Sequence, residues 1–422
     1  MKICVVGKGG REHALIRSLR ESESAPEVFC FPGSEAIHEI EGAGKVDAHD
    51  LESLISWMMA NAIDLCVAGE ESYLVTEAGL ANRCADVGIP CWGPPFAGAQ
   101  MEASKEFAKE FMLRHSIPTG AAAGCATADE ARAAIAGKYP TVLKFDGLAA
   151  GKGVAVCPDE ASAEEFLKEV MEERRFGEGR LLVEECLVGP EISIFAAVSG
   201  PEYLILTPAR DYKRIGEGDV GPNTGGMGAV ASRQLADPEL MVQIEKEIVA
   251  PTVAGLEKDE LNYKGFLYFG LMLTADGPKI IEYNCRFGDP ECQAVIQFNP
   301  EKARALLAES GYQSTSSFPD ISILTTDSET GRREAEALQA MWKEHLDINV
   351  RIIQREWTTY LQKQYDADYD LVAGGWIGDY LDPTTFLEMW ITDGGNNNTG
   401  WGSKTYEKYL NEAENTADIT QR

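Results

Sequence analysis

Short apolar runs separated by amphipathic stretches dominate the first part of the chain. Residues 2–7 and 63–68 are apolar runs typical of buried strands, and a helical pattern over 12–20 follows the first of them. A strand followed by a helix is the opening of an α/β unit. Prolines between residues 90 and 95 then interrupt the pattern, so we predict a domain boundary near residue 96.

Strand and helix patterns also alternate beyond this boundary. The predicted helices cover residues 101–115, 160–174 and about 237–255. The predicted strands cover residues 141–145, 154–157, 181–185, 192–198, 203–207, 266–273 and 278–283. We therefore expect an α/β protein with an N-terminal α/β domain over 1–96, an α+β nucleotide-binding lobe over 97–190 and a second α+β lobe over 191–296.

Charge and composition narrow the functional classes. The chain has 422 residues and a formal charge of −30, from 68 acidic and 38 basic side chains, which argues against nucleic acid or an anionic membrane as a partner. Charged residues from Lys8 onward interrupt the apolar opening, so no leader is predicted and we expect a cytoplasmic protein. The ten cysteines form no C-x-x-C pair, and we expect reduced thiols.

Composition changes abruptly near Ile296. All ten cysteines lie before residue 297, whereas five of the seven tryptophans lie after it (Trp342, Trp357, Trp376, Trp390 and Trp401). We therefore expect the segment 297–422 to be foreign to the part that precedes it.

The first glycine-rich loop, residues 7–13, lies between a strand and a helix. Free backbone N–H groups and the helix dipole at such a position can receive a phosphate. Glu12 stands where the dinucleotide fingerprint G-x-G-x-x-G needs its last glycine, so that motif is absent. A plain structural turn is the alternative interpretation.

A second loop, 147–153, follows a lysine on a predicted strand. Lys144 and Lys152 supply positive charge, and the glycines permit close approach to phosphates. Val154 follows Gly153, so the Walker spacing G-x-x-x-x-G-K-[ST] is absent and another nucleotide-binding fold is indicated. A third glycine-rich loop, 214–228, is interpreted as a substrate-covering loop, although chain mobility alone would also explain its composition.

The strand over 278–283 carries a candidate metal site at its end. Residues alternate along a strand, so Glu282, Asn284 and Arg286 share one face. Oxygen ligands of this kind suit Mg²⁺, and an arginine nearby can hold a carboxylate or an acyl phosphate. A solvated strand face with an ordinary ion pair is the alternative.

Four motifs resemble the phosphoribosylamine–glycine ligase family, which are ATP-grasp enzymes of purine synthesis, over residues 1 to about 296. They are Gly-Gly-Arg-Glu-His-Ala-Leu at 9–15, Asp-Gly-Leu-Ala-Ala-Gly-Lys-Gly-Val at 146–154, Gly-Pro-Asn-Thr-Gly-Gly-Met-Gly at 221–228 and Arg-Phe-Gly-Asp-Pro-Glu at 286–291. Glu70 departs from the family pattern, in which a proline commonly follows the glycine.

The resemblance implies a role for each matching residue. For ATP it implies Lys105, Lys144, Gly147, Gly151, Lys152, Gly153, Glu184, Leu187 and Glu191. For the substrates it implies Gly9, Gly10, Arg11, Glu12, His13, Asp211, Asn223, Thr224, Gly225, Gly226 and Met227. Glu282 and Asn284 match metal ligands, and Arg286, Asp289 and Lys213 match catalytic positions.

The implied reaction uses ATP and Mg²⁺ or Mn²⁺ to convert glycine to glycyl phosphate. The amine of phosphoribosylamine then displaces phosphate, giving glycinamide ribonucleotide. Another ATP-grasp carboxylate–amine ligase and a non-functional chimera are the alternatives.

The tail resembles a different family. Residues 298–312, Glu356-Trp357 and 375–383 resemble the C-terminal lobe of oligopeptide-binding proteins of ABC importers. In that family, tryptophans matching Trp357 and Trp376 shape peptide pockets, and an aspartate matching Asp379 receives the peptide α-ammonium. A cleft needs two lobes, so peptide binding by residues 298–422 is not expected.

Overall fold

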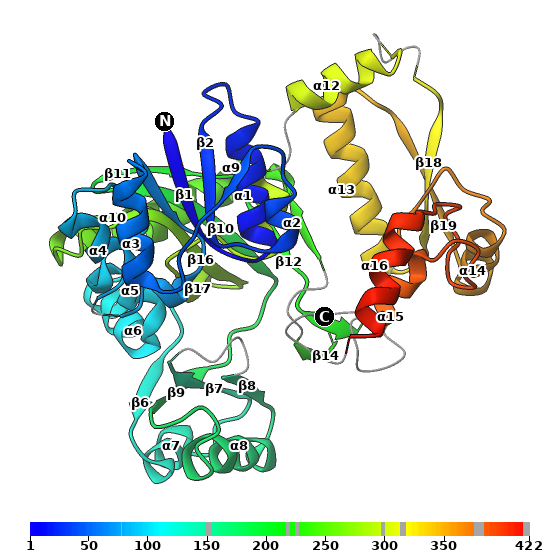
Figure 1. Ribbon diagram of the computed structural model, residues 1–422. Coiled ribbons are helices and arrows are strands. Elements are labelled where there is room, and N and C mark those ends of the chain that lie inside the picture. The colour runs from blue at the N-terminus through cyan, green and yellow to red at the C-terminus, as the bar shows by residue number, and fades with distance from the viewer. Residues whose placement is uncertain are drawn as a thin grey trace. The chain divides into compact units, whose positions relative to one another are not determined.

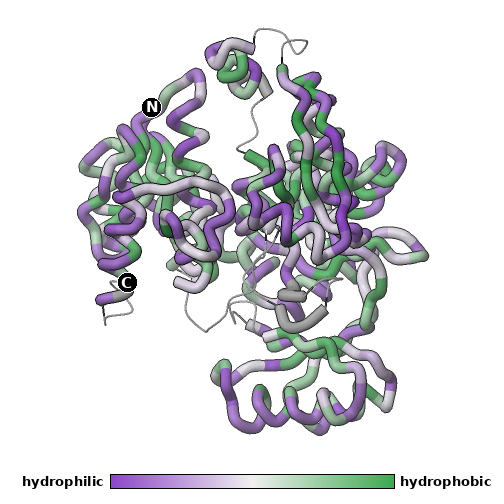
Figure 2. Tube along the Cα trace, turned by 90° about the vertical axis from the view of Figure 1, so that its right-hand side faces the viewer, coloured by the Kyte–Doolittle hydropathy of each residue, from purple (hydrophilic) through white to green (hydrophobic). Residues whose placement is uncertain are grey.

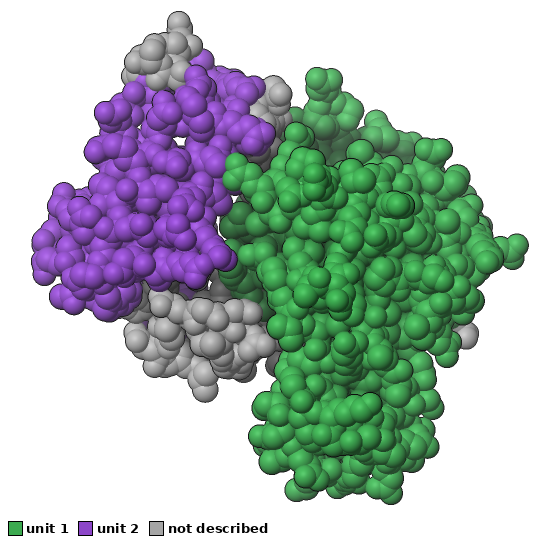
Figure 3. Space-filling model, turned by 180° about the vertical axis from the view of Figure 1, so that it is seen from behind, with its two compact units in different colours: residues 1–213, 223–298 green, residues 214–222, 299–422 purple. Residues whose placement is uncertain are grey.

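The computed structural model describes most of the chain in detail. The described residues are 1–76, 78–147, 153–216, 220–223, 228–296, 300–312, 318–374 and 384–416, of which 214–216, 220–223, 300–302, 330 and 414 are described by their backbone alone. The chain divides into two compact units, one of residues 1–213 and 223–298 and the other of residues 214–222 and 299–422 (Figure 3).

The N-terminal part of the first unit is built on a five-stranded parallel sheet in the order β3-β2-β1-β4-β5 (Figure 1). Its strands are β1 (Lys2–Gly7), β2 (Glu27–Pro32), β3 (Ala43–Lys45), β4 (Leu65–Ala68) and β5 (Cys91–Trp92). Its helices are α1 (Gly10–Arg20), α2 (Glu35–His38), α3 (Leu51–Ala60) and α4 (Leu80–Asp86), and the short 3₁₀ turn η1 (Glu71–Tyr73) follows β4.

The order of these strands switches direction at β1. The chain leaves β1 toward β2 on one side of the sheet, whereas β4 lies on the other side of β1. Ligands of open α/β sheets bind at the carboxyl ends of strands where the order switches in this way. The loops that follow Gly7 and Ala68 meet at this edge, where Gly69 N donates to Val6 O at 2.8 Å.

The helix predicted over 101–115 is interrupted at Ser104. The structure has α5 (Phe96–Ala103) and α6 (Lys105–Arg114), with Ser104 extended at φ −126° between them. The Ser104 hydroxyl accepts a hydrogen bond from Phe107 N and so caps α6. Periodicity alone does not show this break, because both helices continue the same apolar pattern.

A small antiparallel sheet follows, in the order β6-β9-β7-β8. Its elements are β6 (Ala122–Cys125), α7 (Ala128–Ile135), β7 (Thr141–Asp146), β8 (Val154–Cys157), α8 (Glu160–Leu167), the π-helical turn η2 (Lys168–Glu172) and β9 (Arg180–Glu185). The predicted strands and the helix over 160–174 are confirmed within a few residues. The sequence prediction omitted β6 and α7.

A larger antiparallel sheet completes the first unit, in the order β15-β12-β10-β16-β17, with β11 paired to β10. Its strands are β10 (Glu191–Ser199), β11 (Glu202–Ile205), β12 (Ala209–Asp211), β15 (Ala229–Ala231), β16 (Lys264–Thr274) and β17 (Gly277–Asn284). The predicted helix 237–255 is a run of η3 (Arg233–Leu235), α9 (Pro238–Ile244), the π-helical turn η4 (Glu245–Val249) and α10 (Ala250–Lys258), and α11 (Glu291–Ile296) follows β17.

The prediction of a single loop over 214–228 is wrong in part. Two short strands, β13 (Arg214–Gly216) and β14 (Val220–Asn223), pair with each other inside it. Glycine-rich composition favoured a loop because glycine has low strand propensity.

One large hydrophobic core joins the parallel sheet to the large antiparallel sheet. It includes fully buried side chains from both, such as Cys66, Leu80, Ile194 and Phe269. Hydrophobic positions gather along these strands, while outer helices also carry hydrophilic residues (Figure 2). This packing fixes the strand ends that carry the candidate site.

The second unit contains a three-stranded parallel sheet in the order β19-β18-β20. Its elements are α12 (Pro300–Glu309), β18 (Ile321–Thr326), α13 (Glu329–Leu346), β19 (Val350–Arg355), α14 (Trp357–Tyr365), β20 (Leu371–Val372), α15 (Thr384–Leu387), η6 (Glu388–Trp390) and α16 (Lys404–Glu414). The predicted fold class, α/β with a partial α/β lobe at the end, is confirmed. The domain boundaries near 96, 190 and 296 stay predictions.

Candidate functional site

Two motifs that are far apart in the sequence meet in the first unit. Helix α1, which begins in the 9–15 motif, packs against α11, which begins at the end of the 286–291 motif. A Cβ on Gly10 would lie 2.9 Å from Nε2 of Gln293, and Nη1 of Arg11 donates to Phe287 O at 3.1 Å. The first glycine loop and the 286–291 motif therefore border one site.

Glu12 has a structural role at this place. Its carboxylate is 1% exposed, accepts a hydrogen bond from Gly9 N at 2.7 Å and pairs with Arg11 Nε at 2.6 Å. A Cβ on Gly7 or Gly69 would lie about 2.5 Å from Glu12 atoms, so both glycines make room for this side chain. One amide of the helix N-terminus is thus already occupied, which leaves fewer for a phosphate.

Arg286 is held between two carboxylates. Its Nε donates to Glu71 Oε2 at 3.0 Å, and its Nη2 lies 2.9 Å from Glu102 Oε1. Burial lowers the pKa of Arg286, but Glu102 and Glu71 raise it by more, so the guanidinium stays charged. The same Glu102 accepts hydrogen bonds from Asn284 Nδ2 at 2.9 Å and Cys285 N at 2.7 Å. Arg286 is therefore positioned before any ligand arrives.

A cluster of lysines lies where β7, β9 and α6 approach β17. Lys144 Nζ lies 3.1 Å from Glu184 Oε2 and donates to Ile281 O at 3.0 Å. Lys109 Nζ lies 3.4 Å from the same carboxylate. Lys105, the first residue of α6, donates from Nζ to Gly147 O at 2.9 Å. These side chains bring three positive charges to the edge of the small sheet.

Burial and neighbouring carboxylates change the pKa of Lys105 in opposite directions. The pKa of Lys105 is lowered, first by burial and also by Lys144, although Glu282 and Asp146 raise it. A phosphate that adds negative charge between these lysines would relieve the repulsion. The arrangement thus favours an anionic ligand.

Glu282 lies at the centre of these cations. Burial raises the pKa of Glu282, but Lys213, Lys144 and Lys105 lower it by more, so the carboxylate is ionised. Asn284 shares its face of β17, and its side chain donates from Nδ2 to Glu102, so the oxygen of the same amide group is the atom that can act as a metal ligand. Two hard oxygen donors on one strand are the ligand type that Mg²⁺ takes from proteins, so these residues fit such an ion.

A second group of ionisable residues lies on β12 and its neighbours. The pKa of Asp211 is raised to about 7, first by burial and then by Glu291, while Lys213 lowers it. Oδ1 of Asp211 is buried and, among the described residues, has no hydrogen-bond partner. The pKa of Lys213 lies above its ordinary value because of Tyr268 and then the carboxylates of Glu282, Glu191 and Asp211, which outweigh burial. A buried carboxylate oxygen without a hydrogen-bond partner, next to a lysine, is suited to accept a hydrogen bond from a ligand.

The remaining residues that the resemblance assigns to ATP or to the substrates are only partly covered by the structure. Glu184 lies in β9, Glu191 begins β10 exposed to solvent, and Leu187 lies in the connection between them, half-buried. His13 is half-buried on α1, and Gly153 immediately precedes β8. Gly151, Lys152, Thr224, Gly225, Gly226 and Met227 lie outside the described residues, and only the backbone of Asn223 is described.

Sequence reasoning missed several residues that shape the site. Lys109, Glu102, Glu71 and Asp146 form the ion pairs and hydrogen bonds that fix Glu184, Arg286 and Lys105. Lys109 lies four residues after Lys105, so helical spacing could have found it. Glu71 and Glu102 act across long sequence separations, and no local pattern indicates them.

The tail residues linked to peptide binding are only partly described. Trp357 is 56% exposed at the start of α14, and its ring stacks on Tyr360 with centroids 5.6 Å apart. Trp376 and Asp379 lie outside the described residues. The roles that the resemblance implies for these residues therefore stay predictions.

Three family models match the chain. The N domain of phosphoribosylglycinamide synthetase matches residues 1–102, and its ATP-grasp (A) domain matches residues 103–292. A third model, bacterial extracellular solute-binding proteins, family 5 Middle, matches residues 264–398. This match confirms the resemblance of the tail to binding proteins. The last two matches overlap over 264–292, where the structure has β16 and β17 of the first unit.

Several curated relatives are similar to this chain. The phosphoribosylamine–glycine ligase of Allochromatium vinosum is 44% identical over 303 residues, which cover 70% of each chain. The ligase of Caldanaerobacter subterraneus is 41% identical over 299 residues, 70% of this chain and 71% of its own. The trifunctional purine biosynthetic protein adenosine-3 of Drosophila melanogaster is 41% identical, and the chain spans 22% of its length.

Solved structures agree with these relatives. The phosphoribosylamine–glycine ligase of Thermotoga maritima is 32% identical and covers 74% of this chain and 76% of its own, with a TM-score of 0.61. A biotin carboxylase of Campylobacter jejuni, 18% identical with a TM-score of 0.54 over 69% of this chain and 67% of its own, shares the fold alone. Motifs, fold and relatives agree. The chain belongs to the phosphoribosylamine–glycine ligase family, the ATP-grasp ligases of purine biosynthesis.

Proposed function

We propose that this chain joins glycine to 5-phosphoribosylamine at the expense of ATP, giving glycinamide ribonucleotide, ADP and phosphate through glycyl phosphate. One observation carries the proposal. Glu282 on β17 is influenced by Lys105, Lys144 and Lys213. Just beyond the end of this strand, Phe287 O, next to Arg286, accepts a hydrogen bond from Arg11 of the first glycine loop. The candidate groups for a nucleotide and for a carboxylate therefore lie on β17 and directly after it.

The nucleotide would lie along the small sheet. Lys105 and Lys144 bind its phosphates, and Glu184, Leu187 and Glu191 hold adenine and ribose. Because Lys144 is paired with Glu184 at 3.1 Å, ATP shares this lysine with the carboxylate rather than meeting a free cation. Gly147, Gly151, Lys152 and Gly153 complete the loop that covers the phosphates in this proposal.

Glu282 and Asn284 would hold Mg²⁺ or Mn²⁺, which offsets charge on the transferring phosphoryl group. The chain's own lysines contribute to the same task, because Lys105, Lys144 and Lys213 already act on the Glu282 carboxylate. Positioning and electrostatics therefore carry the chemistry, and no covalent enzyme intermediate is needed.

Glycine and phosphoribosylamine would lie near the end of β17. Arg286 binds the carboxylate of glycine, with Asp289 and Lys213 beside it. Gly9, Gly10, Arg11, Glu12 and His13 would border the ribosyl phosphate, and Asp211 accepts from the amine or a ribose hydroxyl. Residues Asn223, Thr224, Gly225, Gly226 and Met227 cover the activated glycine and keep water away.

Coupled detection of ADP tests the proposal. Purified full chain with ATP, Mg²⁺, glycine and freshly generated phosphoribosylamine should release ADP only when both substrates are present. Arg286→Ala should lower ADP release at limiting glycine by raising the KM for glycine, whereas Arg132→Ala, an arginine on α7 that pairs with Glu164 at 2.8 Å, is the matched control. ADP release that ignores glycine would contradict the proposal.

The same proposal gives each part of the chain a role. Residues 1–96 bind phosphoribosylamine, residues 97–190 and 191–296 form the two ATP-grasp lobes, and 297–422 takes no part in the chemistry. We propose a cytoplasmic site of action, with small-molecule substrates and no nucleic acid or membrane partner. In the described part of the chain, no helix combines the length and apolar character needed to cross a membrane.

A further inference from the structure

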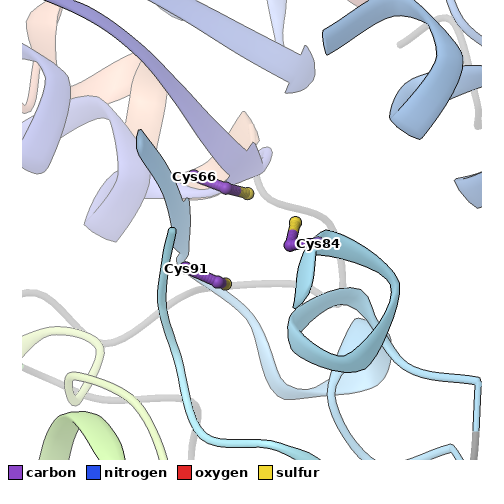
Figure 4. A group of neighbouring side chains, drawn as sticks. All are labelled: Cys66, Cys84 and Cys91. Carbon is purple, nitrogen blue, oxygen red and sulfur yellow. The ribbon is translucent and has the colours of Figure 1, made fainter. Parts of the chain in front are cut away.

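Three cysteine side chains gather in the N-terminal part of the first unit, and neither the ligase chemistry nor the family motifs use them. Cys66 lies on β4, Cys91 on the neighbouring strand β5, and Cys84 on helix α4. Figure 4 shows the three side chains converging from these elements. Their sulfur atoms all lie within 4.8 Å of one another.

The register of the parallel sheet explains why the sulfurs converge. Cys66 is the direct partner of Cys91 in the ladder between β4 and β5, and paired residues of a parallel sheet point to the same face. Helix α4 covers this face and brings Cys84 over the pair.

The spacing is close to that of a metal–thiolate site. Zinc–sulfur bonds of about 2.3 Å in a tetrahedral site place the sulfurs about 3.8 Å apart. Sulfurs within 4.8 Å of one another need to approach by about 1 Å at most, which side-chain rotation can supply. Hard ions such as Mg²⁺ prefer oxygen, so only a soft ion matches three thiolates.

The surroundings also suit a bound ion. Cys66 and Cys84 are fully buried, whereas Cys91 is partly exposed to solvent. All ten cysteines belong to the described residues and are free, so no disulfide occupies these sulfurs. Cys4 is paired with Cys66 on the other side of β4 and is the next thiol along the same row. Three ligands from three elements would fasten α4 to the edge of the sheet.

We propose that Cys66, Cys84 and Cys91 form a binding site for a thiophilic divalent cation of the Zn²⁺ class. Each thiol that becomes a ligand releases its proton to solvent, and a water molecule or a further thiol completes the coordination. The site stabilises the N-terminal part of the chain and takes no part in phosphoryl transfer.

Cadmium titration of the full chain tests this proposal. Reduced protein in excess Mg²⁺, which occupies oxygen sites, should bind one Cd²⁺ with a thiolate-to-cadmium absorption band in the ultraviolet. Cys84→Ala and Cys66→Ala should weaken binding at least about 100-fold, because loss of a group that only orients a ligand already costs about 10- to 100-fold. Cys30→Ala is the matched control, because Cys30 is equally buried and lies on β2 of the same sheet.

A measurement on the unchanged chain covers the case in which the variants fold poorly. Cd²⁺ should slow alkylation of Cys91 at least about tenfold, as followed by mass spectrometry, and leave Cys186, which is also half-buried, at its original rate. Absence of the thiolate band, equal loss of binding in Cys30→Ala and Cys84→Ala, or unchanged alkylation of Cys91 would each overturn the site.

Discussion

The two compact units differ in how much core they possess. In the first unit a continuous core joins two sheets, and it includes many side chains that are fully buried, such as Ile194 and Phe269. In the described part of the second unit, the main cluster of buried side chains consists of Ile323, Ala335, Ile348 and Val350, and Leu324, Tyr360 and Leu410 are buried outside it. Side chains such as Trp357, Trp390 and Trp401 stay between 39% and 56% exposed there.

This difference explains where chemistry can be built. Catalytic groups must be held to within a fraction of an ångström, and only a well-packed scaffold achieves this. The ion pairs and hydrogen bonds of Lys144, Glu184 and Arg286 that fix the candidate site all join residues of the first unit. Residues 299–398 of the second unit match a family model of solute-binding proteins, and we expect substitutions of its side chains to leave the ligation rate unchanged.

The largest expected effect is a difference in ligase activity between a variant of the first unit and a variant of the second. Glu282→Gln removes one metal-ligand charge and should lower kcat/KM for ATP roughly 100-fold, the scale of a lost electrostatic contact in a transition state. Trp357→Ala, at an exposed position of the second unit, should leave the rate within a factor of about two. Steady-state kinetics at several Mg²⁺ concentrations measures both, and equal losses would remove the distinction.

The next effect separates the units by stability. Ile323→Ala and Ile194→Ala each remove a buried isoleucine from a central strand, at 2% and 0% exposure, and each should cost about 2–5 kcal/mol. Five of the seven tryptophans lie beyond residue 297, so tryptophan fluorescence mainly reports unfolding of the second unit. Ile323→Ala should therefore shift the fluorescence transition to a lower urea concentration. The urea concentration at which activity is lost should not change. Ile194→Ala should lower the activity transition. Coincident transitions in both variants would show a single cooperative unit.

A smaller effect depends on pH. Because the pKa of Asp211 is raised to about 7 in the folded chain from 3.8, the folded state binds this proton more tightly than the unfolded state. Stability therefore falls as pH rises from about 4 to 7 and stays low above it. Asp211→Asn should raise Tm by a few degrees at pH 8 and by less at pH 5.

Asp259→Asn is the matched contrast for this experiment. Asp259 pairs with Arg114 at 2.7 Å, and although burial raises its pKa, the neighbouring His115 and Arg114 lower it by more. That stability contribution is present above the ordinary pKa, so Asp259→Asn should lower Tm at pH 8. A gain in Tm for both variants at pH 8 would contradict the opposite effects expected for the two carboxylates.

The smallest effect concerns the first glycine loop. The pKa of Glu70 is raised, first by burial and then by Glu12, while Arg11 and Lys8 lower it. A negative charge at this position opposes an incoming phosphate, so Glu70→Gln should lower the KM for phosphoribosylamine roughly 2- to 5-fold. Glu71→Gln, which instead loses the partner of Arg286, should raise the KM for glycine. An unchanged KM in Glu70→Gln would place the phosphate elsewhere.

Much of the first unit could be predicted from the sequence because its strands are short apolar runs and its motifs are long. The face shared by Glu282 and Asn284 followed from strand periodicity alone. The break at Ser104, the strand pair inside 214–228 and the roles of Glu71 and Glu102 did not. These depend on capping and on pairing between residues far apart in the chain, which local patterns do not encode.

Glycine activation by the first unit alone is tested most directly by positional isotope exchange. With ATP labelled at the β,γ-bridging oxygen, glycine and the full chain, label should scramble into the β non-bridging position, and Glu282→Gln should suppress the exchange. The exchange should require glycine and should be unaffected by Trp357→Ala. Exchange that proceeds equally without glycine, or that is lost in Trp357→Ala, would contradict activation by the first unit alone.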